Sequence, residues 1–245
     1  MLEGLYSAAA GMAAQQTRLD AVSNDIANVN TTGYKPVRVA FRDLVYDPAG
    51  RGALNAAVRT GAGAAATQAG RAWQPGPLQD TGRPLDLALS GDGFFEVRRA
   101  DGTQALTRAG AFDVDVRGRL VTATGDRVEP AITIPRGTDP AGVHVAPDGT
   151  VTAGGRRLGR LSLVTVPAPD ALQPAGDSLF VATAASGRPA PARGTTVIQG
   201  SLEGSGVDMG EAMVGMMEAQ RSFELASRAI QMQDQVLQIA NEVKR

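Results

Sequence analysis

Apolar residues near both ends of the chain recur every seven positions, whereas those in the middle alternate over short runs. The repeating residues near the start are Leu5, Met12, Leu19 and Ile26. Those near the end are Met209, Met216, Phe223, Ile230 and Leu237, each followed three residues later by Ala or Gln. A seven-residue repeat of bulky residues beside smaller ones is typical of helices packed closely on other helices. The pattern therefore predicts a long helix at each end.

The C-terminal helix carries a second apolar row, which contains Leu225, Met232 and Ile239. Its apolar surface is therefore wider than one seam, and we expect it to touch more than one neighbour. Burial of the nine stripe side chains contributes less free energy than the conformational entropy that is lost when two long helices become ordered. This comparison favours assembly with helices of other subunits. The alternative is a two-helix layer that covers a β-domain of the same chain.

The residues between the helices predict short antiparallel strands. Runs such as Leu85 to Leu89 and Phe94 to Arg98 are separated by turn dipeptides such as Asp101-Gly102. The last helix is expected to begin at Asp208, with Glu211 completing a capping box. The predicted class is α+β, with terminal helices in a coiled-coil layer and a central, mainly β domain. The predicted segments are an N-terminal assembly helix and turn (1–33), an extended Ala/Gly-rich connector (34–76), a central β-domain (77–205) and a C-terminal assembly helix (206–245).

Composition excludes several classes of partner. The 245 residues are 43% apolar, and a net charge of −1 gives no field to attract nucleic acid or anionic lipid. The longest apolar runs are too short for membrane insertion, and the first residues lack the pattern of a secretory signal. The absence of cysteine excludes disulfides and thiolate sites.

No residue pattern predicts catalysis, a cofactor or a metal site. The single histidine, His144, lies in an alternating strand without a second histidine or a cysteine nearby. Asp113 and Asp115 lie on one face of a strand, and Asp148 begins an Asp-Gly turn. Residues 91–95 lack the glycine and lysine positions of phosphate-binding loops. We interpret that segment as a glycine bend that places two phenylalanines against the β-core.

Three segments together resemble the flagellar rod and hook family of axial proteins. They are residues 23–35 (SNDIANVNTTGYK), residues 85–95 (LDLALSGDGFF) with 107–112 (TRAGAF), and residues 200–235, which include GSLE, VDM, EAQRSFE and DQ. The motif residues that carry the resemblance are Asn24, Asn28, Asn30, Thr31, Gly33, Gly91, Gly93, Phe94, Phe95, Asp208, Gln220 and Arg221. Within the family, the length, the segment between Phe41 and Trp73, and residues 129–135 resemble the distal rod members most, and the proximal rod or hook-basal body members are the alternative.

The resemblance implies a structural subunit of the flagellar basal body that polymerises into a hollow helical tube and transmits torque from motor to hook. It implies terminal helices lining an export channel, and export through the flagellar type III apparatus without a cleaved signal. The implied partners are further copies, other rod proteins, the hook protein, ring bushings and rod-capping factors. The family carries out no catalysis and uses no cofactor.

Two functions of other classes fit the sequence less well. A secreted glycan-binding β-domain with a coiled-coil stalk would need stacking rings, but aromatics form only 4% of the chain. A hydrolase would have to depend on His144 or on the carboxylates discussed above.

Overall fold

The computed structural model describes residues 2–44, 47–48, 59–60, 63–135, 137–138 and 140–243. Two long helices, α1 (Leu2–Ala27) and α2 (Met209–Val243), precede and follow a series of strands, and the strand pairs between residues 71 and 207 are antiparallel. The predicted α+β class with a central antiparallel domain is therefore confirmed. The coiled-coil layer stays a prediction.

The chain forms two compact units. The helical unit contains the described residues of Met1–Ala27, Val37–Gly70 and Asp208–Arg245, and the β unit contains those of Asn28–Pro36 and Arg71–Val207. The four predicted segment boundaries stay predictions. Each unit is described separately below.

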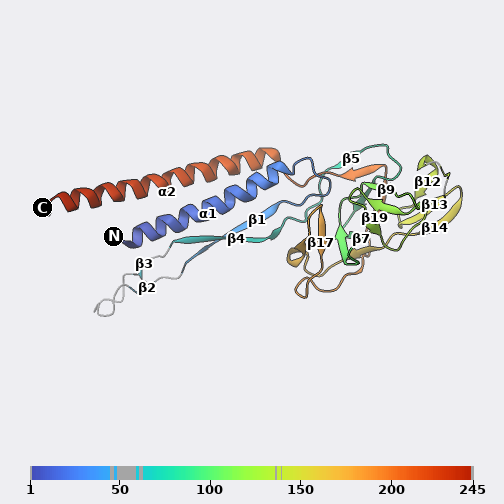
Figure 1. Cartoon of the computed structure of the whole chain (residues 1–245), viewed down its shortest axis with the longest axis horizontal. Helices are drawn as coiled ribbons and strands as arrows, with labels where there is room; N and C mark the ends of the chain where they lie inside the picture. Colours follow the sequence, from blue (N-terminus) through green and yellow to red (C-terminus); the bar gives the residue numbers. More distant parts are fainter. Residues whose placement is uncertain are drawn as a thin grey trace. The chain divides into compact units, whose positions relative to one another are not determined.

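In the helical unit, α1 and α2 lie side by side along their length (Figure 1). Small residues allow this approach, because Ala14, Ala21 and Ala219 are buried. Arg18 and Glu218 form a salt bridge of 3.0 Å across the pair. At the start of α2, the Asp208 carboxylate accepts a hydrogen bond from the Glu211 backbone N–H at 3.0 Å, which is the predicted helix cap.

The connector contains paired strands that composition did not predict. Strand β1 (Val37–Asp43) pairs with β4 (Ala64–Arg71), and β2 (Asp47–Pro48) pairs with β3 (Arg59–Thr60). Pairing satisfies backbone groups that an isolated extended chain would leave to water. Gly63 lies so close to α1 that a Cβ there would meet Ser7 and Ala10 at about 3.0 Å. The segment is thus extended but more regular than its Ala/Gly-rich sequence indicated, while residues 45–46, 49–58 and 61–62 lie outside the described part.

The β unit is organised around strand β7 (Phe94–Arg98), which pairs with β8, β11 and β15. These strands belong to a nine-stranded sheet with β16, β17, β10, β9 and β18, and smaller sheets pair β12–β13–β14, β6–β19 and β5–β20. Two short 3-10 helices, η1 and η2, interrupt the strands. The remaining bounds are β5 Leu78–Asp80, β6 Leu87–Ser90, β8 Gln104–Thr107, β9 Phe112–Val114, β10 Leu120–Thr122, β11 Arg127–Val128, η1 Pro140–Gly142, β12 Val143–Val145, β13 Thr150–Ala153, β14 Arg156–Arg160, β15 Leu163–Thr165, η2 Pro169–Ala171, β16 Gln173–Pro174, β17 Leu179–Val181, β18 Ala190–Pro191, β19 Thr196–Gln199 and β20 Ser201–Glu203.

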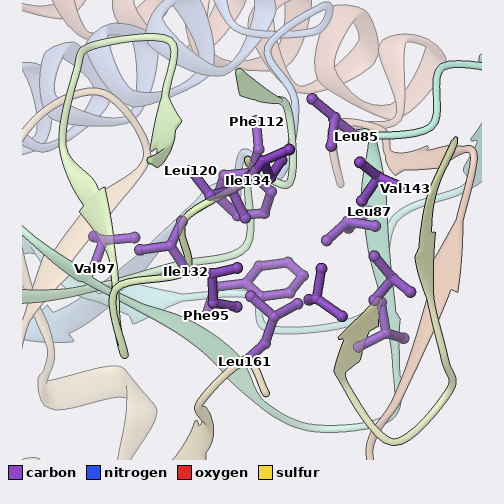
Figure 2. Close-up of a cluster of buried hydrophobic side chains, with 14 of the residues drawn as sticks. Leu85, Leu87, Phe95, Val97, Phe112, Leu120, Ile132, Ile134, Val143 and Leu161 are labelled. Carbon is purple, nitrogen blue, oxygen red and sulfur yellow. The ribbon is translucent and has the colours of Figure 1, made fainter. Parts of the chain in front are cut away.

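Adjacent phenylalanines on β7 enter two different cores, because successive side chains of a strand point to opposite faces. Phe95 is fully buried in the larger core and meets Phe112 edge to face, with ring centroids 5.1 Å apart. Figure 2 shows this aromatic residue surrounded by aliphatic side chains such as Leu87, Ile132 and Leu161. Phe94 enters a smaller core, in which Trp73 packs on it at 5.2 Å and on Phe180 at 4.9 Å.

Candidate assembly surface and buried charged cluster

The predicted stripe residues lie mainly along the side of each helix that packs within the chain. On α1, the stripe residues Leu5, Met12, Leu19 and Ile26 are half-buried. On α2, Met216 and Ile230 are half-buried, whereas Met209 and Phe223 are 39% and 37% exposed. Met216 precedes buried Ala219 by three residues and so shares the face of α2 that packs on α1. Leu237 lies on α2, but its side chain is outside the described part.

The more exposed apolar face of α2 is its other side, which we call the outer face of α2. Its apolar members are Met213, Val214, Met217, Leu225, Met232, Val236 and Ile239, and each is half or more exposed. Leu225, Met232 and Ile239 are the second apolar row noted in the sequence. Periodicity alone favoured the stripe from Met209 to Leu237 as the assembly surface. Seven exposed apolar side chains on one side of a helix mark a surface that another molecule covers.

The N-terminal signature ends in a turn that only glycine fits. The Thr31 backbone N–H donates to the Asn28 carbonyl at 3.0 Å, and the Thr31 hydroxyl donates to the Asn28 side-chain oxygen at 3.1 Å. Gly33 has a φ of +65°, and a Cβ there would lie 2.7 Å from the backbone of Arg108 and Ala109. Asn24 and Asn30 of the same signature are exposed.

Three charged residues from the three signature segments meet inside the β unit. The Lys35 ammonium donates to Glu203 Oε1 at 2.5 Å and to the Gln74 carbonyl at 2.7 Å. The Arg108 guanidinium donates to Glu203 Oε2 at 3.1 Å and to the Gly91 carbonyl at 2.8 Å. All three charged side chains are at least 97% buried. We call Lys35, Arg108 and Glu203 the charged cluster.

The charged cluster joins segments that are distant in sequence. The Gly33 backbone N–H donates to the Glu203 carbonyl at 2.8 Å, and the Gly76 N–H donates to the Glu203 carboxylate at 3.0 Å. The Gly206 N–H donates to the Tyr34 carbonyl at 2.9 Å. Glu203 therefore holds residues 33 and 76 in one place within the β unit, and the Tyr34 carbonyl holds residue 206.

Burial governs the electrostatics of the charged cluster. Loss of hydration lowers the pKa of Lys35, and the hydrogen bond and charge of Glu203 oppose this shift only in part. Arg108 adds a second buried cation, whose Nε atom has no hydrogen-bond partner. Two cations therefore depend on one carboxylate. The sequence did not predict this cluster, although each of its residues lies in one of the three signature segments. A charged residue within an otherwise apolar or glycine-rich motif was the one indication that the side chain is buried.

The central signature forms the expected glycine bend. Gly91 has a φ of +100°, which favours glycine, and Gly93 is buried so closely against Thr195 that a Cβ would meet its side chain at 3.1 Å. Phe94 and Phe95 then enter the two cores. At the C-terminal signature, Asp208 caps α2, and Gln220 and Arg221 are exposed on that helix.

The residues considered for catalysis are dispersed and have structural partners. His144 is exposed on β12. Asp115 binds Arg119 at 2.6 Å, and the Arg119 backbone N–H is the main cause that lowers the pKa of Asp115. The Thr150 N–H likewise lowers the pKa of Asp148, and Asp113 pairs with Arg83 at 3.0 Å. The described residues include no group of three or more His, Cys, Asp or Glu side chains that could hold a metal ion. In the same part of the chain, neither long helix has the length and apolarity required to cross a membrane.

Comparison with known families gives matches in each signature region. Residues 5–35 match the flagella basal body rod protein family, residues 88–153 match the flagellar hook protein FlgE/F/G D1 domain, and residues 198–243 match the flagellar basal body rod FlgEFG protein C-terminal family. The flagellar basal-body rod protein FlgG of Borreliella burgdorferi is 36% identical over the full length of both chains.

The chain belongs to the flagellar basal-body rod protein family. The FlgG protein of Bacillus subtilis is 38% identical over the full length of both chains, and the FlgF protein of Caulobacter vibrioides is 34% identical over 89% of each. The resemblance stated from the sequence is confirmed, with FlgG as the nearer type. Members of this family are structural, so the helical unit and the charged cluster are the natural candidates for functional sites.

Proposed function

We propose that this protein is a structural subunit of the distal rod of the bacterial flagellum. Its subunits polymerise into a hollow helical tube that transmits torque from the motor to the hook. The observation that supports this most strongly is the exposed apolar outer face of α2, because a protein acting alone would place such a face in water. The full-length similarity to FlgG proteins supports the distal position.

The parts of the chain have separate roles in this proposal. Residues 1–33 and 206–245 are assembly helices that form a coiled-coil layer, residues 34–76 connect them, and residues 77–205 form the outer β-domain. The stripe residues and the outer face of α2 are the assembly contacts. Function then comes from packing and stiffness, without a catalytic step, a cofactor, nucleic acid or direct membrane insertion.

The proposed location is the basal body, which the chain reaches through the flagellar type III apparatus without a cleaved signal. Its neighbours are other copies, other rod proteins, the hook protein, ring bushings and rod-capping factors. A proximal rod position is the second candidate, and the similarity to FlgF supports it.

Electron microscopy of isolated basal bodies tests this proposal directly. An epitope inserted at the exposed Gly154-Gly155 turn between β13 and β14 labels the full chain within its β unit. Label at the hook end of the rod is expected, whereas label at the membrane end would establish the proximal alternative. Absence of the protein from basal bodies of motile cells would overturn both.

A substitution on the outer face of α2 tests the assembly role. Leu225 is 66% exposed, so Leu225→Asp should leave the folded chain intact while placing a charge in the proposed contact. Incorporation into basal bodies should fall at least tenfold. The neighbouring exposed substitution Glu224→Gln should leave incorporation unchanged. Normal incorporation of Leu225→Asp would show that this face is not an assembly contact.

A further inference from the structure

Two arginines interrupt the apolar outer face of α2. Arg221 and Arg228 are exposed and lie one heptad apart, so they occupy the same row of the helix, between Met217 and Met232. The salt bridges formed by the described residues include neither arginine. The face is thus apolar with a row of positive charge along its middle.

The outer face of α1 has the opposite character. The exposed positions on α1 include Ala9, Ala13, Gln16, Asp20 and Ser23, which recur at three- and four-residue steps along one side of the helix. This side is away from Ala14 and Ala21, which are buried. Apart from Tyr6, which is 73% exposed near the start of α1, its described side chains are small or polar, and Asp20 carries the only negative charge among them. The Asp20 carboxylate accepts a hydrogen bond from the Gln16 side chain at 2.8 Å. None of the salt bridges among the described residues includes Asp20.

These two faces cannot meet within one chain. The α1–α2 seam of a single chain uses the side of α2 on which Ala219 is buried and a Cβ at Gly215 would meet Arg18 and Val22. Glu218, which binds Arg18, lies at the edge of this side, in the same row as Leu225. The outer faces lie on the far sides of that seam. Any contact between them therefore joins two copies.

Charge and size decide which face of a second copy covers α2. Two outer faces of α2 packed together would each contribute Arg221 and Arg228 with Glu224 beside them, so both faces would carry a net positive charge, and like charges at such a contact are unfavourable. The outer face of α1 instead offers small side chains, between which bulky Met and Leu residues can pack, and a carboxylate within the row.

We propose that the outer face of α2 docks on the outer face of α1 of a second copy, with Asp20 paired to Arg221 or Arg228. This inference rests on the proposed function and names the contact by which copies assemble. Because it joins two different surfaces, the contact is heterologous and repeats without closing when the rotation does not form a ring. Each copy then presents one free α1 face and one free α2 face to the next pair of neighbours.

Charge exchange tests this contact in the full chain. Asp20→Arg, Arg221→Asp and Arg228→Asp are introduced singly, and Asp20→Arg is combined with each of the other two. The amount in purified basal bodies relative to total cell content is the measurement. Asp20→Arg and the reversal of its partner arginine should each reduce incorporation at least tenfold, and the matching double variant should restore it to within twofold of the unaltered chain. The arginine whose reversal restores assembly of Asp20→Arg is the partner of Asp20, and it defines the register of α2 on α1 of the second copy.

Control variants separate this contact from folding and from the proposed function. Arg156→Asp, on exposed strand β14, changes charge equally and should incorporate normally. Circular dichroism and thermal unfolding of each purified variant should match the unaltered chain. If the unaltered chain enters basal bodies but neither double variant restores assembly, or all single variants incorporate normally, the contact is wrong while the rod function stands. If the unaltered chain is absent from basal bodies, the rod function itself fails.

The absence of cysteine allows a direct second measurement. A chain that combines Asp20→Cys with Arg221→Cys or Arg228→Cys contains no other thiol. A short bismaleimide added to assembled rods should link copies into a ladder for the pair that restored assembly. Asp20→Cys alone supplies one thiol per copy, so it can link copies only in pairs and should give no ladder. A failure of both interface pairs to cross-link in assembled rods would overturn the proposed contact.

Discussion

The Lys35 ammonium lies 2.5 Å from Glu203 Oε1, although 168 residues separate the two in sequence. Both side chains are almost completely buried, and Arg108 binds the other carboxylate oxygen. A buried carboxylate with two cationic partners cannot be removed without leaving uncompensated charge. This relationship joins Lys35 of the N-terminal signature to Glu203 of the C-terminal signature within the β unit.

Replacement of Glu203 should destabilise the β unit strongly. Glu203→Gln keeps the size of the side chain but leaves Lys35 and Arg108 as neighbouring buried cations. We expect the free energy of unfolding to fall by about 3–5 kcal/mol. Urea unfolding followed by fluorescence of Trp73, the only tryptophan, reports on this unit because Trp73 packs on Phe94 and Phe180.

The matched control is Asp113→Asn, which removes a carboxylate from the exposed pair with Arg83. Solvent screens such a pair, so the expected change is about 0–1 kcal/mol. Equal effects of the two substitutions would contradict a special role for the buried cluster.

Alkaline pH should change stability through Lys35. Burial lowers its pKa in the folded chain, whereas the unfolded chain titrates near the ordinary value of 10.5. Between these two values the unfolded chain binds more protons, so this contribution to stability rises with pH and levels off above 10.5. The difference in unfolding free energy between the unaltered chain and Lys35→Met, measured from pH 7 upward, should therefore shift in favour of the unaltered chain. Parallel pH profiles would argue against a lowered pKa.

Gly110 should tolerate no side chain. A Cβ at this position would lie 1.6 Å from the Leu87 carbonyl oxygen, and both residues are held by the Leu87 N–H to Gly110 carbonyl hydrogen bond of 2.9 Å. Because backbone atoms would have to move, Gly110→Ala should cost more than about 3 kcal/mol. Calorimetric unfolding measures this, with Gly142→Ala as the control, since its Cβ would meet nothing within 4 Å. A stability loss of the same size in both variants would contradict this reason.

The first turn of α2 should depend on Asp208. Its carboxylate accepts the Glu211 N–H, so Asp208→Ala should weaken the helix start by about 1 kcal/mol, while Asp208→Asn should largely preserve it. Amide hydrogen exchange at Glu211 should accelerate roughly fivefold in the alanine variant alone. Unchanged exchange in Asp208→Ala would show that tertiary packing, rather than the cap, fixes this end.

Sequence patterns predicted the local structure well where the cause is local. The seven-residue repeat gave both helices, the Asp208 cap gave the start of α2, and alternation gave strands such as β7. Pairing of β1 with β4 was not predictable, because Ala and Gly carry little periodic signal. Periodicity also cannot say which of two apolar rows meets the same chain. That choice depends on the close approach of Ala14, Ala21 and Ala219.

The charged cluster could not be predicted for a different reason. Lys35, Arg108 and Glu203 are individually ordinary charged residues, and only the complete fold brings them together and removes water from around them. The three motifs located each residue, but spacing along the chain gave no indication that the three segments meet.

The position of Glu203 also affects the order in which the chain folds. Gly33 and Lys35 find their partner 168 or more residues later, so loop closure precedes the gain from these contacts. A chain that becomes available from its N-terminus leaves its first signature without this partner until residue 203 has arrived. Completion of the β unit therefore depends on delivery of nearly the whole polypeptide, and an interrupted chain lacks the carboxylate that closes it.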